Sequence, residues 1–181
     1  AAKQRNLNVG APTFIPFVGA WIQLKEQPMD VETEAYVGIA GPVAGTFAAM
    51  ACYYAAEYTH SQLMLALAYA GFMINLFNLI PLSPLDGGRI TAIISPKVWW
   101  LGVPILIGLF IVNQSPMLLL IAIMALPHLM STFRGGPHGL PERYYDVPLA
   151  TRVSYGLYYL GLAAFLGIMS YETHLLLPSR N

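Results

Sequence analysis

Four long stretches without a charged side chain constrain the fold of this chain more than any other feature. They cover residues 35–56, 58–85, 98–133 and 153–171. A helix needs about 20 apolar residues to cross a bilayer, and each stretch is close to that length or longer. Charged residues make up 10% of the chain, against about 25% in typical soluble domains. They are too few to form the surface of a soluble domain, so the sequence predicts an integral membrane protein.

The longest uncharged stretch is broken by Asn113-Gln114-Ser115-Pro116, which is typical of a tight turn between two spans. The sequence therefore predicts one domain, an all-α polytopic membrane protein with about five transmembrane helices. The expected helices are residues 33–57, 61–81, 97–113, 115–132 and 152–172, and residues 134–152 are expected to form a cytoplasmic loop.

Five crossings would distribute the basic residues very unevenly between the two sides of the membrane. Only Arg180 would lie on one side, and the other eight Lys and Arg residues would lie on the opposite side. This is the asymmetry of the positive-inside rule, and four or six crossings would scatter the same residues. Asp86 is therefore expected on the cytoplasmic side of a bacterial membrane, or on the equivalent side of an organelle membrane.

Residues 8–28 precede the first expected helix and have a different character. The core of this segment, Thr13–Leu24, is rich in β-branched and aromatic residues, and Pro12, Pro16 and Gly19 interrupt any helix. We expect a membrane-associated β-strand or hairpin here. Unpaired backbone groups are costly in lipid, so the strand must be buried in protein, paired in a hairpin, or left to pair with a partner.

The sequence NLIPLSPLDGGRI, residues 78–90, contains the candidate functional carboxylate, Asp86. A carboxylate beside a hydrocarbon-like segment is a functional candidate because its burial is costly. Asn75 and Asn78 are three residues apart on one helix face, so both amides are expected near one interior site. Asp86-Gly87-Gly88 is expected to form a turn that tolerates positive φ. The alternative interpretation is an ordinary interfacial aspartate in that turn.

A metal ion would need more ligands than Asp86 alone. His60 and His174 are expected on the outer side, whereas His128 lies near the inner end of its helix and a hydrogen-bonded structural role is the more common one there. No two histidines stand at i and i+4. The single cysteine, Cys52, excludes an intrachain disulfide. The basic residues are too few and dispersed for nucleic-acid binding.

Three separated motifs resemble one family. NLIPLSPLDGG resembles the signature of the site-2 protease family of intramembrane zinc metalloproteases, in which an Asn stands eight residues before the Asp of a Leu-Asp-Gly motif. Asn78, Pro84, Asp86 and Gly87 match that pattern. PTFIPFVGAWI and EAYVGIAGPVAG, both upstream, also resemble the family. The resemblance covers roughly residues 1–95.

The resemblance implies a function and a set of site residues. Asp86 would be the third protein ligand of a catalytic Zn²⁺, and Asn78 and Asn75 would bind the substrate or the developing oxyanion. The other two ligands would be histidines of an H-E-x-x-H motif, whose Glu is the general base. That motif is absent from the 181 residues, and we expect it immediately upstream of Ala1.

The strand-like segment would then bind the substrate. The residues expected to pair with an unwound substrate helix by strand addition are Phe17, Val18, Gly19 and Ala20. The expected partners are membrane-anchored protein substrates, the lipid bilayer and other subunits of a membrane complex. The alternative is a non-catalytic pseudoprotease subunit that binds partner transmembrane helices. A small transporter is a third reading, disfavoured by the lack of paired intramembrane charges.

Overall fold

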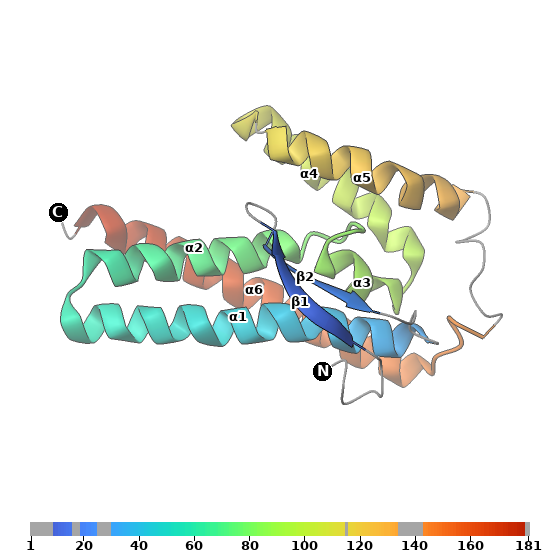
Figure 1. The fold of residues 1–181 in the computed structure, drawn as a ribbon, viewed down its shortest axis with the longest axis horizontal. Helices are drawn as coiled ribbons and strands as arrows, with labels where there is room; N and C mark the ends of the chain where they lie inside the picture. Colours follow the sequence, from blue (N-terminus) through green and yellow to red (C-terminus); the bar gives the residue numbers. More distant parts are fainter. Residues whose placement is uncertain (1–8, 16–18, 25–29, 115, 134–142, 180–181) are drawn as a thin grey trace.

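The computed structural model describes residues 9–15, 19–24, 30–114, 116–133 and 143–179. Figure 1 shows helices at both ends of the long axis and a short hairpin near the N-terminus. In chain order the elements are β1 (Val9–Ile15), β2 (Gly19–Leu24), α1 (Val31–Thr59), α2 (Gln62–Asn78), α3 (Asp86–Ala92), the 3-10 helix η2 (Pro96–Leu101), α4 (Gly102–Asn113), α5 (Pro116–Phe133) and α6 (Leu149–Ser179).

The expectation of five transmembrane helices is wrong. Among the described residues, two helices are long and apolar enough to cross a membrane, α1 and α6. The other apolar helical segments are shorter: Gln62–Asn78, Pro96–Val112 and Leu118–Met130. The uncharged stretches are apolar as expected, but the helices within them do not all extend over the whole stretch. The helix expected over 61–81 ends at Asn78, before Pro81, and the one expected over 97–113 begins as a 3-10 turn.

Helices α1 and α2 form an antiparallel pair, and α6 lies alongside them (Figure 1). A side-chain cap starts each of the first two helices, because the first backbone N–H groups of a helix have no partner within it. Asp30 accepts a hydrogen bond from the Thr33 N–H at 2.6 Å, and Ser61 accepts one from the Met64 N–H at 3.4 Å. His60, in the left-handed conformation, ends α1 and allows the chain to reverse.

Strands β1 and β2 form an antiparallel two-stranded sheet. Phe14 pairs with Ala20, and Ile15 pairs with Gly19. The register shifts between Val9 and Pro12, where proline cannot donate to the ladder.

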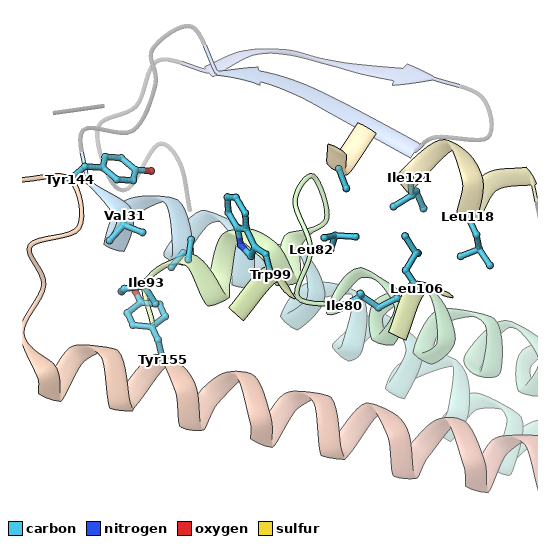
Figure 2. Packing of buried hydrophobic residues seen from close by; sticks show 13 residues of the cluster. Val31, Ile80, Leu82, Ile93, Trp99, Leu106, Leu118, Ile121, Tyr144 and Tyr155 are labelled. Carbon is cyan, nitrogen blue, oxygen red and sulfur yellow. The ribbon is translucent and has the colours of Figure 1, made fainter. Parts of the chain in front are cut away.

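Two buried clusters surround the short helix α3. The larger cluster joins Val31 of α1, Ile93 after α3, Trp99 of η2 and residues of α4, α5 and α6, with its ten labelled members shown in Figure 2. The smaller cluster includes Phe72 of α2, Ile90 of α3 and Leu166 of α6. Ile90 and Ile93, three residues apart, are therefore buried in different clusters, which holds this part of the chain from two sides.

Candidate functional site

The loop between α2 and α3, residues 79–85, folds back over the first turn of α3. A Cβ atom added at Gly87 would overlap the backbone carbonyls of Leu79 and Ile80, and one added at Gly88 would lie 2.8 Å from the Leu82 oxygen. Only hydrogen at these positions allows the loop backbone to approach so closely. The loop is further held by Tyr159 of α6, whose hydroxyl donates to the Leu79 oxygen at 2.6 Å.

The expected turn at Asp86-Gly87-Gly88 is wrong. Asp86 is the first residue of helix α3, and both glycines are helical and lack positive φ. The glycines are required for close approach between backbones instead of for a special conformation. Trp99 stabilises the same turn, because its indole N–H donates to the Gly88 oxygen at 2.8 Å.

Three glycines of α1 form the opposite wall of the site. A Cβ at Gly38 would lie 3.2 Å from the Arg89 Cβ, and one at Gly41 would lie 3.3 Å from the Asp86 Oδ2. A Cβ at Gly45 would overlap the Asn75 side-chain amide. Positions 38, 41 and 45 share one helix face and extend over about 10 Å of α1. Arg89, Asp86 and Asn75 therefore lie in this order along one glycine-lined face.

The Asp86 carboxylate is half-buried against this face. Burial raises the pKa of the Asp86 carboxyl above its ordinary value, and the positive charge of Arg89 opposes this rise. Within the part of the chain that the structure describes, no residue donates a hydrogen bond to this carboxylate. An ionised group in such a position favours a cation or a hydrogen-bond donor from elsewhere.

The two asparagines differ in their surroundings. Asn75 is buried, and its Nδ2 donates to the Gly71 oxygen at 2.7 Å, which leaves its Oδ1 toward Gly45. Asn78 is half-buried at the last position of α2. The structure therefore brings Asn75 and Asp86 to the same face of α1, one helical turn apart.

The remaining expected site residues are Phe17, Val18, Gly19 and Ala20. Gly19 and Ala20 are the first two residues of β2, where they pair with Ile15 and Phe14. Phe17 and Val18 lie outside the described residues.

His128 and His174 have partners other than Asp86 among the described residues. The His128 Nδ1 lies 3.3 Å from the Met124 oxygen, to which an N–H at that atom donates, and the ring packs edge-on against Trp99. His174 contacts the ring of Tyr69. Within the described residues, no three His, Cys, Asp or Glu side chains gather closely enough to hold a metal ion.

A polar network beside Asp86 was not predicted from the sequence. The Arg89 Nε lies 3.5 Å from the Glu34 Oε1 of α1, and Glu34 also accepts a hydrogen bond from the Tyr144 hydroxyl. The Tyr144 backbone oxygen in turn accepts from the Val31 N–H at 3.1 Å. These partners are 55 and 110 residues apart in the sequence, so no local pattern indicates them.

Arg152 of α6 extends the network to the far end of α3. Its guanidinium donates to three backbone oxygens, those of Ile94, Tyr145 and Val147, at 3.4, 2.8 and 3.2 Å respectively. The segment 143–148 is thereby held against both α1 and the end of α3.

The Tyr144–Glu34 hydrogen bond predicts a dependence of stability on alkaline pH. Burial raises the pKa of the Tyr144 hydroxyl, and the Glu34 charge and hydrogen bond raise it further. The raised pKa stabilises the fold fully below the ordinary tyrosine pKa of about 10, and this stabilisation is lost as pH rises above it. Tyr144→Phe should cost about 1–2 kcal/mol at neutral pH and should flatten the alkaline fall.

The measurement is the free energy of unfolding in detergent, followed against pH for wild type and variant. Tyr145→Phe is the comparison: burial and the Glu34 charge also raise the pKa of Tyr145, but no hydrogen bond joins it to Glu34 among the described contacts, so it should flatten the alkaline fall less than Tyr144→Phe does. Equal alkaline curves for wild type and Tyr144→Phe would contradict the assignment.

Comparisons with known proteins identify no relative. No family model, no curated protein and no solved structure matches the chain.

Proposed function

We propose that this chain is the metal-binding core of an intramembrane zinc metalloprotease that hydrolyses membrane-anchored protein substrates. In this proposal Asp86 is the third zinc ligand, and Asn75 and Asn78 bind the substrate at the reacting carbonyl. The sequence resemblance supplies the reaction, and the surroundings of Asp86 support the choice of ligand.

The exposed surface supports a membrane location. Large apolar side chains are more than half exposed on every long helix, among them Phe47 at 71%, Leu63 at 65%, Ile111 at 68%, Ile123 at 56% and Leu157 at 65%. Monomeric soluble proteins rarely expose large contiguous apolar patches. Together with the length and apolar character of α1 and α6, this exposure favours lipid as the surrounding solvent.

The observation that carries the proposal is the half-buried Asp86 carboxylate, which accepts no hydrogen bond from any residue that the structure describes. It packs on Gly41, within the stretch of α1 that has no charged side chain. A carboxylate at such a position is costly unless it binds a partner. Gly87 and Gly88 allow the 79–85 loop to pack on the first turn of α3, and Gly41 leaves room for the carboxylate beside α1.

The donor chemistry at Asp86 fits one position of a zinc site. Zinc accepts carboxylate oxygen beside imidazole nitrogen, and catalytic sites use three protein ligands. The described residues offer one such ligand, and the proposal assigns the other two to an H-E-x-x-H helix. When bound, zinc acts as a Lewis acid that activates water and polarises the scissile carbonyl.

Other residues of the chain would position the substrate. The Asn75 amide is buried and held by Gly71, which favours a fixed orientation beside the reacting group. The hairpin would add the unwound substrate as a further strand, because a helix hides its carbonyls in its own hydrogen bonds. Phe17, Val18, Gly19 and Ala20 are the residues proposed to line that contact.

The test replaces Asp86 by asparagine in the protein expressed from its complete gene. Asp86→Asn keeps the size of the side chain but removes its charge, so bound zinc should fall at least about tenfold and substrate cleavage should be lost. Asp146→Asn, on the exposed loop, is the matched control and should keep both. Normal zinc content and cleavage in Asp86→Asn would overturn the proposal. A wild type without zinc or cleavage would favour the pseudoprotease.

A further inference from the structure

Helix α3 carries one acid and one base on the face toward α1. The Asp86 carboxylate lies beside Gly41, and the Arg89 Cβ lies beside Gly38. Residues three apart on a helix are neighbours, and opposite charges at this spacing attract each other. An ion pair between Arg89 and Asp86 is therefore expected from their spacing on the helix.

Arg89 is instead paired with another element. Its Nε lies 3.5 Å from the Glu34 Oε1 of α1, and no ion pair joins it to Asp86 among the described residues. Glu34 is itself fixed by the Tyr144 hydroxyl, and the Tyr144 backbone is fixed by Val31. The competing carboxylate is thus held by Tyr144, whose backbone is in turn bonded to the first residue of α1.

We propose that Glu34 is a positioning residue that holds the Arg89 guanidinium away from Asp86 and so keeps the Asp86 carboxylate available to a cation. The identity of that cation as catalytic zinc rests on the proposed function. The arrangement of Glu34, Arg89 and Asp86 does not depend on the proposed function. Arg89 and Glu34 are 29% and 27% exposed, and ion pairs at partly exposed positions are weak. Removing the charge of Glu34 should therefore release Arg89, and Asp86, three residues away on the same helix, is then its nearest acidic neighbour on α3.

The first test measures the direction of Arg89 without any metal. In a Cys52→Ala, Asp86→Cys chain, the thiol at position 86 reports a nearby guanidinium, because a neighbouring arginine favours the reactive thiolate. Glu34→Gln should raise the alkylation rate at neutral pH by about threefold or more. Adding Arg89→Gln should return the rate to its starting value.

Glu32→Gln is the matched control for this test. It removes the same charge two residues earlier on α1, and it should leave the alkylation rate unchanged. The inference is overturned if Glu34→Gln does not accelerate alkylation, or if the acceleration persists after Arg89→Gln, since Arg89 would then not be its cause.

The second test measures zinc affinity with Asp86 in place. Glu34→Gln should weaken zinc binding about tenfold, and the added Arg89→Gln substitution should restore it. A merely structural role for the ion pair predicts the opposite, because a second substitution would not repair a damaged fold. Equal zinc affinity in the wild type and Glu34→Gln would overturn the inference.

The two proposals fail in different ways. If Asp86→Asn binds zinc as well as the wild type, the proposed function fails, while the thiol rates still decide whether Glu34 directs Arg89. If zinc binding depends on Asp86 but not on Glu34, the proposed function stands and the inference about Glu34 fails.

Discussion

Gly87→Ala is expected to destabilise the fold by more than about 3 kcal/mol. The added methyl group would overlap the backbone carbonyls of Leu79 and Ile80. A backbone cannot move aside as a flexible side chain can, and this loop is held by Tyr159 on its other side. The loop and the start of α3 must therefore separate, and Asp86 moves with them.

The measurement is the unfolding free energy in detergent, with Gly108→Ala as the matched control. Gly108 is helical, and a Cβ there would meet nothing within 4 Å. Alanine favours helix over glycine by about 1 kcal/mol, so the control should be neutral or slightly stabilised. Equal stabilities for the two alanine variants would show that the loop does not pack on α3 as described.

Gly45→Ala is the second substitution with a large expected effect, about 2–3 kcal/mol of destabilisation. The new methyl group would overlap the Asn75 amide. That amide is buried and bonded to Gly71, so it cannot rotate away without losing its partner. The packing of α1 against α2 should therefore weaken around Gly45 and Asn75.

A second substitution separates this mechanism from a general effect on the helix. Gly45→Ala combined with Asn75→Ala removes the overlapping atoms, so the double variant should be more stable than Gly45→Ala alone. Gly167→Ala, where a Cβ meets nothing within 4 Å, controls for helix propensity. Absence of rescue in the double variant would contradict the packing of Asn75 on Gly45.

The apolar stretches predicted where helices lie but not how long they are. Apolar composition alone gave correct approximate positions for α1 and α6, because each helix contains one uncharged run, 35–56 or 153–171, and extends beyond it at both ends. It failed at α2, where the run continues through the 79–85 loop, since the same residues suit a buried loop and a helix. Side chains that are apolar on every face carry no periodic signal to mark an end.

The candidate site was predictable in part for a different reason. Asp86 stands out in the sequence because a lone carboxylate follows an uncharged run. The turn predicted at Gly87 and Gly88 was wrong, because a Gly-Gly pair is equally compatible with a turn and with a helix that packs closely on another backbone. The contact between Glu34 and Arg89 had no sequence signal, because it depends on how α1 meets α3 in three dimensions.

The three hydrogen bonds of Arg152 have a consequence for synthesis on the ribosome. Arg152 and Tyr159 belong to the last helix of this chain, yet they pair with the oxygens of Ile94 and Leu79 on either side of α3. A nascent chain therefore contains the complete Asp86 segment well before it contains the groups that secure it. The hydrogen bonds to the Ile94 and Leu79 oxygens can form only after α6 has been synthesised.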